Sequence, residues 1–331
     1  MTSREIMIKT LEFDSPCRVA MDLPAPYTTD IFWGWLPADP KCPGTPWHQL
    51  PDGTWEMLDE WGNTWRRLES ISKGEVARGA FESWDAMPSH TWPDYANPDR
   101  YAAAKKAFAE KPDKFRILGI PGFPFNIARK MRRLDNFLVD IVIDEARVVE
   151  LLARVEAIMA DAIRMAGTTG ADAVMFAEDW GAQKALLINP ATWRKLFRPG
   201  FDRLCSIARE NGLYVFMHSC GYIYEIIGDL IDAGINVLQL DQPQLMSVER
   251  LADEFAGRVT FWCPVDIQNT LQTKDAAKIE ADAKLMVERF GCNGRGGFIA
   301  GMYPSNEAIG LEPKWQQIAA DAFAKYGGWQ A

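Results

Sequence analysis

The chain has 331 residues, a length that suits one α/β barrel, and its 48% hydrophobic and 24% charged residues are typical of a globular protein. A formal net charge of −9 argues against nucleic acid as a partner, because nucleic-acid binding requires a basic surface. The basic cluster at residues 129–133 is too short to reverse this, and we interpret it as a solvated helix face or at most a local anion contact. No apolar run is long enough for a membrane helix and residues 1–10 lack a signal-peptide core, so we expect a cytoplasmic protein.

Residues 1–115 are rich in proline, glycine and tryptophan and contain few long helical patterns. Residues 59–68 predict a β-hairpin, with Gly62 and Asn63 in its turn. Residues 98–111 predict a helix. We interpret this half as an N-terminal elaboration of the fold that follows, and most of its tryptophans as packing residues.

Residues 116–331 have a more regular pattern, in which short apolar runs alternate with longer amphipathic runs. The apolar runs predict strands at residues 115–120, 173–177, 214–218, 237–240, 259–263 and 297–300. The amphipathic runs predict helices at residues 144–167, 190–211, 223–233, 248–255, 275–290 and 313–326.

Strands that alternate with helices pair in parallel through right-handed crossovers. We therefore predict a (β/α)8 barrel of the TIM type, formed by residues 1–331 as a single domain. An open, doubly wound α/β sheet is the alternative. No glycine-rich phosphate-binding fingerprint follows any predicted strand, which weakens the dinucleotide-binding version of that alternative.

In a barrel of this kind the active site forms at the carboxyl ends of the strands. The predicted strand at 214–218 runs into His218, Ser219, Cys220 and Gly221. His218 and Cys220 are two residues apart, so in an extended chain their side chains point to the same side. A converging imidazole and thiolate suit a soft divalent metal, zinc above all. The alternative is a capped strand end with a buried thiol and a hydrogen-bonded histidine.

A catalytic zinc site uses three protein ligands and keeps one position open. We predict His218, Cys220 and Cys263 as these ligands, although Cys263 is equally consistent with a buried core thiol. Glu178 or Asp179 is a candidate fourth ligand that substrate displaces. The other cysteines lie away from the strand ends, and in a reducing compartment we expect structural thiols there rather than disulfides.

Other side chains at the strand ends are candidates for catalysis or for substrate contacts. Asp179 and Asp241 are candidates to orient His218. For proton transfer or substrate orientation we predict Glu178, Asp179, Asp266 and Tyr303. For substrate contacts we predict Trp180, Gln242, Gln268 and Met217. Asp266 and Gln268 have a structural alternative, in which they cap a helix and bond a loop.

These residues resemble the uroporphyrinogen decarboxylase superfamily, and within it the corrinoid-dependent O-demethylase methyltransferases (methyltransferase I). The resemblance spans most of the chain, and a His-x-Cys motif in this context is its most specific part. The motifs that carry it are Asp59-Glu60-Trp61-Gly62 with Lys73-Gly74-Glu75, Asp179-Trp180-Gly181-Ala182-Gln183 with Ile188-Asn189-Pro190, and His218-Ser219-Cys220-Gly221 with Gly234-Ile235-Asn236 and Gln242-Pro243.

The chain departs from this resemblance at two points. The decarboxylase branch has an Arg-Gln-Ala-Gly-Arg motif near its N-terminus, where this chain has residues 15–20 with a single arginine, Arg18. That difference argues against porphyrinogen decarboxylation. The methyltransferases that act on coenzyme M have a further cysteine ligand after a strand like residues 296–299, and here residues 300–304 contain no cysteine. Cys263 or a carboxylate therefore replaces that ligand.

The resemblance implies methyl transfer to or from the cobalt of a corrinoid that a partner protein carries. We expect the demethylating direction, with a methoxylated aromatic compound as methyl donor. Zinc bound to the ether oxygen would stabilise the phenoxide that must leave, which is a Lewis-acid role. Trp180 and N-terminal aromatic residues are candidates to stack on the substrate. Superfamily members are often dimers, so a homodimer is also expected.

Three alternatives remain at this point. The first is methyl transfer from the corrinoid protein to a thiol or to tetrahydrofolate, in which zinc lowers a thiol pKa. The second is metal-independent decarboxylation of an acidic aromatic compound, which needs Arg or Lys at strand ends that are acidic or neutral here. The third is a non-catalytic binding module with a decayed site.

Overall fold

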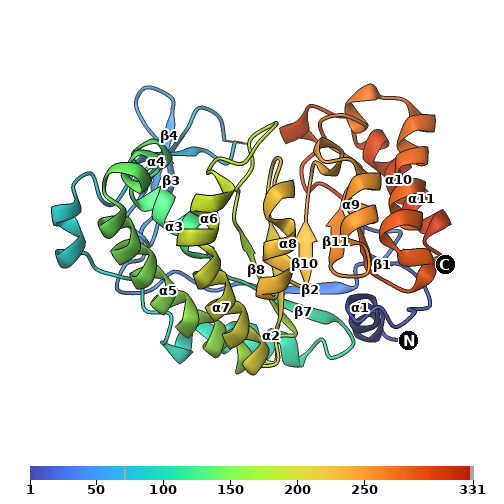
Figure 1. Cartoon of the computed structure of the whole chain (residues 1–331), viewed down its shortest axis with the longest axis horizontal. Helices are drawn as coiled ribbons and strands as arrows, with labels where there is room; N and C mark the ends of the chain where they lie inside the picture. The colour runs from blue at the N-terminus through green and yellow to red at the C-terminus, as the bar shows by residue number, and fades with distance from the viewer. Residues whose placement is uncertain (71, 329–331) are drawn as a thin grey trace.

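The computed structural model describes residues 1–70 and 72–328, and within these residues eight parallel strands form a nearly closed barrel (Figure 1). The strand order is β1-β12-β11-β10-β9-β8-β7-β2, so strands β7 to β12 lie side by side in the order of the sequence and β12 also pairs with β1. The strands are β1 (Ala20–Asp22), β2 (Ile31–Gly34), β7 (Phe115–Gly119), β8 (Ala173–Ala177), β9 (Tyr214–His218), β10 (Val237–Gln239), β11 (Thr260–Cys263) and β12 (Phe298–Gly301). The predicted (β/α)8 barrel is confirmed.

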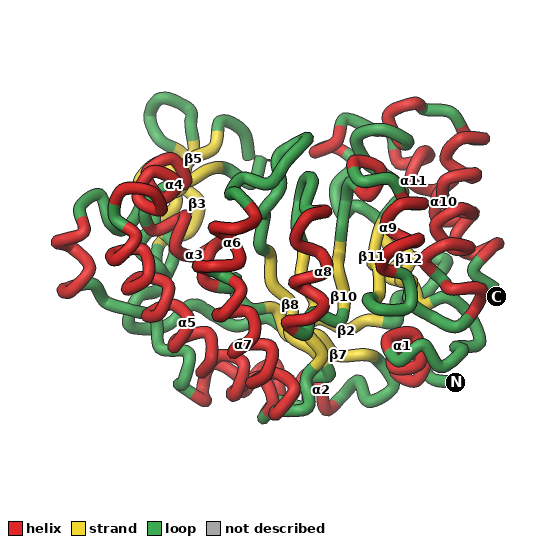
Figure 2. The backbone as a smooth tube through the Cα atoms, in the orientation of Figure 1, coloured by secondary structure: helices red, strands yellow, loops and turns green. Residues whose placement is uncertain are grey.

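Helices surround the barrel and connect its strands (Figure 2). They are α1 (Ser3–Leu11), α2 (Ala102–Ala109), α3 (Pro124–Met131), α4 (Leu134–Ile143), α5 (Glu145–Gly167), α6 (Pro190–Leu196), α7 (Arg198–Glu210), α8 (Tyr224–Ala233), α9 (Val248–Phe255), α10 (Ala276–Phe290) and α11 (Pro313–Tyr326). Among the described residues, none of these helices combines the length and the apolar character needed to cross a lipid bilayer.

Alternate residues of each strand face the barrel interior, because successive side chains of a strand point to opposite faces. One buried cluster fills the interior with Phe115, Ile117, Ala173, Phe216, Val237, Trp262 and Ile299. Helix α1 contributes Ile6, Met7 and Leu11 to the same cluster, so it closes the amino-terminal end of the barrel. The intervening strand residues, such as Leu118 and Met217, pack in a second cluster with the surrounding helices. The open end of the barrel is therefore the end where the strands finish.

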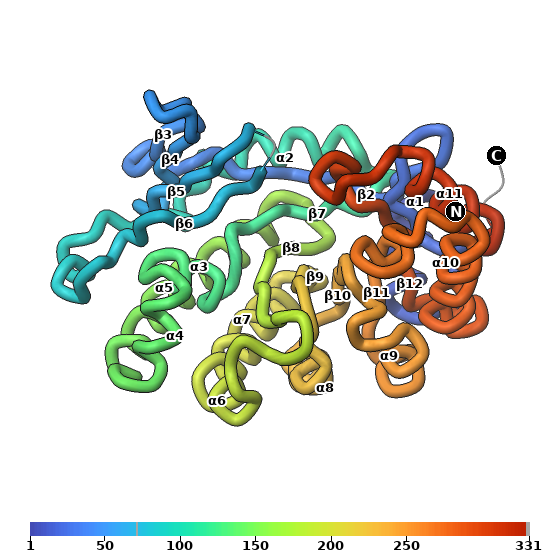
Figure 3. The backbone as a smooth tube through the Cα atoms, turned by 90° about the horizontal axis from the view of Figure 1, so that it is seen from above, coloured from blue at the N-terminus to red at the C-terminus, as the bar shows by residue number. Residues whose placement is uncertain are grey.

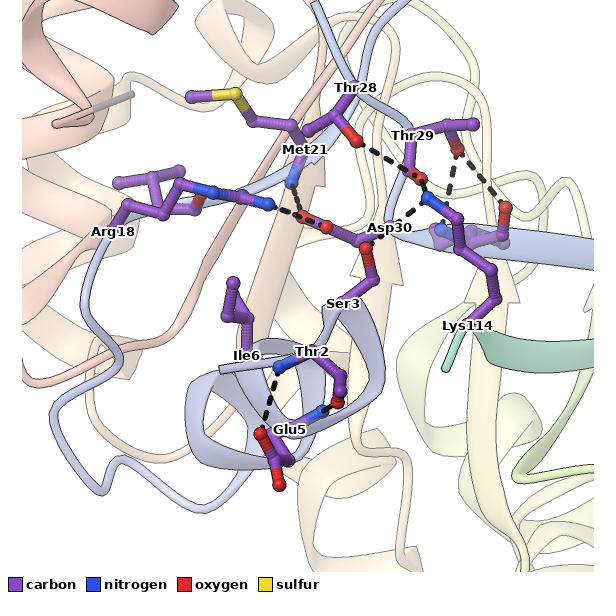
Figure 4. A network of polar contacts seen from close by, with 12 residues as sticks. Thr2, Ser3, Glu5, Ile6, Arg18, Met21, Thr28, Thr29, Asp30 and Lys114 are labelled. Atoms are coloured by element: carbon purple, nitrogen blue, oxygen red, sulfur yellow. Dashed lines mark hydrogen bonds and ion pairs between the residues drawn. The ribbon is translucent and has the colours of Figure 1, made fainter. Parts of the chain in front are cut away.

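The seam between β1 and β2 is held by a buried aspartate rather than by a continuous ladder (Figure 4). Both oxygens of Asp30 accept hydrogen bonds from the guanidinium of Arg18, each at 2.7 Å. Asp30 Oδ2 also accepts a hydrogen bond from the Met21 N–H at 2.8 Å, and the Asp30 N–H donates to the Met21 carbonyl at 2.7 Å. A fully buried carboxylate requires such partners, and together they join the first two strands of the barrel.

The N-terminal elaboration contains a four-stranded antiparallel sheet beside α3 (Figure 3). Its strands are β3 (Thr45–Gln49), β4 (Trp55–Leu58), β5 (Thr64–Arg67) and β6 (Glu75–Arg78). The predicted hairpin is present as β4 and β5 around the expected turn, but its first strand lies wholly before residue 59, where the predicted hairpin began. The turn is held by Asp59 Oδ1, which accepts from the N–H groups of Trp61 at 3.0 Å and Asn63 at 2.8 Å. Gly62 between them has a φ of +83°, which glycine adopts without strain.

The predicted strands and helices after residue 115 agree with the structure, with one main difference in the helices. The helix expected over residues 190–211 is divided into α6 and α7 at Phe197. Pro199 lies in the first turn of α7, where its missing N–H costs no hydrogen bond. The expected helix at 98–111 is a short 3-10 helix (Pro98–Tyr101) followed by α2. Helices α1, α3 and α4 and strands β1, β2, β3 and β6 had no counterpart in the predictions.

Candidate metal centre

Three side chains of metal-binding type meet at the carboxyl ends of β8 and β9. Asp179 follows β8, His218 is the last residue of β9, and Cys220 lies two residues further on. One potential ligand atom of each residue lies within 4.8 Å of the other two. Nε2 of His218 is 3.3 Å from Sγ of Cys220 and 3.5 Å from Oδ1 of Asp179. All three side chains are partly buried, and we call them the Asp-His-Cys cluster.

The pairing of β8 with β9 brings these residues together. Ala177 lies opposite His218 in the parallel ladder, and the Glu178 N–H donates to the His218 carbonyl at 2.9 Å. Asp179 is two residues after Ala177, so its side chain is on the same side as His218, whereas the side chain of Glu178 between them is on the other side. The alternation along a strand therefore selects Asp179, and not Glu178, as the acid beside the histidine.

A chain of hydrogen bonds fixes the tautomer of His218. Its Nδ1 is bonded to Oε1 of Gln239, and Nε2 of Gln239 donates to Oδ1 of Asp241 at 2.8 Å. An ionised carboxylate only accepts hydrogen bonds, so Asp241 requires the NH2 group of Gln239, and the Gln239 oxygen must then accept from Nδ1–H. The unprotonated Nε2 of His218 then points to the cluster, where Sγ of Cys220 lies 3.3 Å away, and this is the nitrogen that a metal-ligating histidine presents.

Asp179 is held in the cluster by two donors. Its Oδ1 accepts from the Cys220 N–H at 3.0 Å, and its Oδ2 accepts from the guanidinium of Arg129 in α3 at 3.3 Å. Burial by itself would raise the pKa of Asp179, but His218, the Cys220 N–H and Arg129 outweigh that effect and lower the pKa. Asp179 is therefore a carboxylate at neutral pH, the form in which it binds a cation.

Cys220 has the opposite electrostatic environment. Burial, followed by the negative charges of Asp179 and Asp241, raises the pKa of its thiol to about 12. A coordinated metal ion reverses this balance, because its charge outweighs the local acids and the thiol binds as a thiolate. Imidazole, thiolate and carboxylate are all ligands of zinc, and three protein ligands with an open position are typical of a catalytic zinc site. The residues present therefore fit a zinc ion.

Two glycines allow the loops after β8 and β9 to touch through their backbones. A Cβ atom on Gly181 would lie 2.4 Å from the Tyr222 nitrogen, and a Cβ atom on Gly221 would lie 2.4 Å from the Gly181 oxygen. Gly221 also has a φ of +76°. The Tyr222 N–H donates to the Ala182 carbonyl at 2.8 Å across this contact. Only glycine fits so close an approach, which fixes Asp179 against Cys220.

The side chains of Cys263 and Met217, both selected as site residues, are buried in the outer hydrophobic layer and do not join the cluster. Trp262 faces the barrel interior, so its neighbour Cys263 faces outward, where it is fully buried in the hydrophobic layer under the helices. Met217 is buried in the same layer. The structure therefore brings Asp179 to His218 and Cys220, and does not bring Cys263 to them.

Glu178 and Trp180 point away from the barrel interior into the layer beneath α3. Oε1 of Glu178 accepts from the N–H groups of Phe123 at 2.7 Å and Asn126 at 3.0 Å, at the start of α3, and burial raises the pKa of this carboxyl to about 8. Oε2 of Glu178 is buried without a partner among the described residues. Trp180 is fully buried and its ring stacks on Phe125 with centroids 3.9 Å apart.

The remaining predicted residues lie in the loops after β10, β11 and β12. Asp266 is buried, and its carboxylate accepts from the N–H groups of Gln244, Gln268 and Asn269, so it holds two loops together. Gln268 itself is exposed. Oε1 of Gln242 accepts from the Gly221 N–H at 2.9 Å, and the backbone of Tyr303 is bonded to the side chain of Gln316.

Gln239 and Arg129 belong to the surroundings of the cluster and were not selected from the sequence. Gln239 is two residues before Asp241, and this spacing places both side chains on one side of a strand. That spacing was the feature of the sequence from which a contact between Gln239 and Asp241 could have been predicted. The basic cluster at residues 129–133 was interpreted as a solvated helix face or at most a local anion contact. A solvated face is wrong for Arg129, which bonds Asp179, and for Arg132, which is 7% exposed and bonds Asp140 at 2.8 Å.

The barrel and the Asp-His-Cys cluster define a TIM-barrel protein with a candidate metal centre at the open end, where barrels of this fold form their sites. Residues 84–302, more than half of the chain, match the family described as uroporphyrinogen decarboxylase (URO-D). The chain therefore belongs to this family, as its motifs had suggested, and the family supports an enzymatic function.

Solved structures with a similar fold include a methyltransferase from Methanosarcina mazei, with 18% sequence identity and a TM-score of 0.55. That match covers 68% of this chain and 63% of the methyltransferase, so this chain spans less than two thirds of its length. The 3-keto-D-glucoside 4-epimerase from E. coli matches at 9% identity and a TM-score of 0.43, over 74% of this chain and 94% of the epimerase. Similarities at these identities concern the fold, and no curated protein sequence matches this chain.

Proposed function

We propose that this protein is a zinc-dependent methyltransferase that moves a methyl group from a methoxylated aromatic compound to the cobalt of a corrinoid protein. The observation that carries the proposal is the Asp-His-Cys cluster at the open end of the barrel. The donor residues would be His218 through Nε2, Cys220 as thiolate and Asp179 as carboxylate. A bound zinc ion supplies a Lewis acid that stabilises negative charge on the ether oxygen when the methyl group leaves.

The protein residues prepare this chemistry in three ways. Gln239 and Asp241 hold His218 in the tautomer that presents Nε2. Arg129 and the Cys220 N–H keep Asp179 ionised and aimed at the cluster. Because these contacts already hold the donor residues in place, the residues do not have to reorient when the substrate binds. This is the main contribution that a preorganised polar site makes to catalysis.

Proton transfer to the phenoxide product needs a side chain at the site whose O–H group is not already bonded to another acceptor. Of the acids selected from the sequence, Asp266 already accepts several backbone hydrogen bonds, and Glu178 faces away from the barrel interior. The hydroxyl of Tyr303 has no hydrogen-bond partner among the described residues. We therefore favour Tyr303, which follows β12, as the proton donor.

The methyl acceptor in this proposal is a substrate carried by a second protein. Cobalt in a corrinoid ring must approach the methyl carbon from the side opposite to the ether oxygen, so the corrinoid protein would dock at the open end of the barrel. No side chain of this chain needs to act as a nucleophile, because the reduced cobalt atom is itself the attacking group.

The test is a metal and methyl-transfer assay on the purified chain. The protein is loaded with zinc, its metal content is measured, and it is then mixed with methoxylated benzoates and reduced free cobalamin as acceptor. We expect about one zinc per chain, given three ligands, and formation of methylcobalamin. In Cys220→Ser both zinc and activity should be lost, whereas Cys17→Ser, which changes an exposed thiol, should retain both.

Two results would contradict the proposal. A wild-type chain that is folded but binds no zinc would remove the metal from the mechanism. A zinc-loaded chain that moves the methyl group of methylcobalamin to a thiol or to tetrahydrofolate, and demethylates no aromatic ether, would reverse the direction of transfer.

A further inference from the structure

Three tryptophans form an aromatic stack at the open end of the barrel. Trp33 is in β2 and Trp35 follows that strand, so both side chains lie on the interior side. Their rings are stacked with centroids 5.2 Å apart and an interplanar angle of 9°. Trp33 in turn lies against Trp262 of β11, with centroids 6.1 Å apart. Trp35 ends the stack and is 67% exposed, whereas most large aromatic residues of the chain are buried.

Glycines at the ends of neighbouring strands make room for this stack. Gly119 is the last residue of β7, and a Cβ atom there would lie 2.5 Å from the Trp35 ring. Gly301 is the last residue of β12, and a Cβ atom there would lie 2.6 Å from Nε1 of Trp262. The edge of the six-membered ring of Trp35 therefore lies against the strand end of β7, which supports the indole from the side while most of its surface is open to solvent.

The stack lies on the same inner surface as the Asp-His-Cys cluster. His218, Gln239 and Trp262 are direct neighbours across β9, β10 and β11 in the parallel ladder. Neighbouring strands are roughly 4.8 Å apart, so the backbone of Trp262 lies about 10 Å from that of His218. Trp35, at the other end of the stack, follows β2, and β7 alone lies between β2 and β8, the strand that Asp179 follows. A substituted aromatic ring on the outer face of Trp35 can therefore extend across the barrel mouth toward the cluster.

We propose that the outer face of Trp35 is a stacking platform that positions a planar aromatic ring of the substrate, with its methoxy group directed to the Asp-His-Cys cluster. This inference rests on the proposed function, and it identifies the residue that selects aromatic over aliphatic methyl donors. A quaternary ammonium donor would instead need aromatic faces around it on several sides. Trp33 and Trp35 are parallel and offer one flat face, which suits an aromatic ring.

The experiment measures binding without any methyl transfer. The zinc-loaded protein, without a corrinoid protein, is titrated by calorimetry with the three methoxybenzoate isomers and with 4-methoxycyclohexanecarboxylate, which has the same substituents on a non-planar ring. We expect the best methoxybenzoate to bind more tightly than the cyclohexane compound. Trp35→Leu should weaken the aromatic ligand about 3- to 10-fold, the size of a lost stacking contact, while Trp35→Phe should retain most of the affinity.

Trp47→Leu is the matched control, because Trp47 lies on the antiparallel sheet against Arg67. The inference would be overturned if Trp35→Leu and wild type bound methoxybenzoate with equal affinity, or if wild type bound the cyclohexane compound as tightly as methoxybenzoate. It would also be overturned if glycine betaine bound in a way that depends on Trp35, or if wild type bound no methoxybenzoate. The binding assay tests the platform separately from the proposed function, because the protein can bind the aromatic ring without transferring a methyl group. Where transfer occurs, Trp35→Leu should raise KM more than it lowers kcat.

Discussion

His218 and Gln239 lie opposite each other on neighbouring parallel strands, and the hydrogen bond between them decides which nitrogen of the histidine faces the cluster. Gln239 is itself oriented by Asp241, at 2.8 Å. The arrangement depends on direction, because the oxygen of Gln239 must accept from the histidine while its nitrogen donates to the aspartate. Gln239 is thus a positioning residue, and its effect on the metal site can be measured without any substrate.

Gln239→Leu should weaken zinc binding by about 10- to 100-fold, the usual effect of losing the group that orients a metal-ligating histidine. Gln239→Glu should also weaken zinc binding, since two carboxylates would face each other at positions 239 and 241. Adding Asp241→Asn reverses only the bond between positions 239 and 241, because the new amide donates to the new carboxylate. An oxygen at position 239 can still accept from Nδ1–H of His218, so most of the affinity should be restored. Competition with a chromophoric chelator at fixed pH measures each dissociation constant.

Gln317→Leu is the control for these variants, since Gln317 bonds Asp321 on the surface of α11. An unchanged zinc affinity in Gln239→Leu would show that the histidine is held in place by other contacts. Failure of the double variant to recover affinity would show that an acceptor at position 239, oriented by its bond to position 241, is not what holds the histidine.

Gly221→Ala should disrupt the contact between the loops after β8 and β9. The left-handed backbone costs a non-glycine residue about 1–2 kcal/mol, and the overlap with the Gly181 carbonyl adds about 1–3 kcal/mol. Gly212→Ala is a matched control, because Gly212 has a φ of +70° and no atom within 4 Å of the position of its Cβ. Only the first cost should be seen there. Chemical denaturation measures both free energies of unfolding, and equal losses would argue against the close approach.

Cys263→Ser should leave the zinc content of the protein unchanged. Its side chain is fully buried among apolar groups, so introducing a hydroxyl should lower the free energy of unfolding by about 1–3 kcal/mol. Metal analysis and thermal unfolding separate the two effects. Loss of zinc from a variant that remains folded would restore Cys263 as a ligand and would require a rearrangement of β11.

Asp172 should contribute stability that depends on pH. It pairs with Arg116 and with Arg4, each at 2.9 Å, and thereby ties α1 to β7. Burial would raise the pKa of Asp172, but the bonds from Arg116 and Arg4 outweigh it and lower the pKa below 3.8. A carboxyl with a lowered pKa in the folded state stabilises the fold above its unfolded pKa, and this contribution is lost as the pH falls through the folded pKa.

Asp172→Asn should therefore lower the free energy of unfolding at pH 7 by about 2 kcal/mol, the size of a charge-assisted hydrogen bond, and the difference from wild type should shrink below pH 3.8. Urea unfolding between pH 2 and pH 7 tests this expectation. Asp135→Asn, which breaks the exposed pair with Arg133, should cost less than about 1 kcal/mol at any pH. A difference between Asp172→Asn and wild type that stays constant with pH would exclude the ionic contribution.

The sequence by itself determined the barrel and two members of the cluster. Short apolar runs alternating with amphipathic ones allowed little besides parallel strands joined by helices. The spacing of His218 and Cys220 fixed their common side, because alternation over two residues is a local property of any strand. Turn chemistry at Gly62 was local as well, and the predicted hairpin is present. The short strands β1 and β2 and the helix α1 had too little periodicity to be recognised.

Only the tertiary structure decided which further residues join His218 and Cys220. Every residue of β11 is buried, so its sequence has no polar alternation from which the direction of Cys263 can be read. The partner of His218, Gln239, depends on the register between β9 and β10, which no local pattern specifies. Asp179 reaches Cys220 because two glycine loops, 40 residues apart, pack backbone to backbone. These three relationships are set by long-range packing and cannot be resolved before the barrel is assembled.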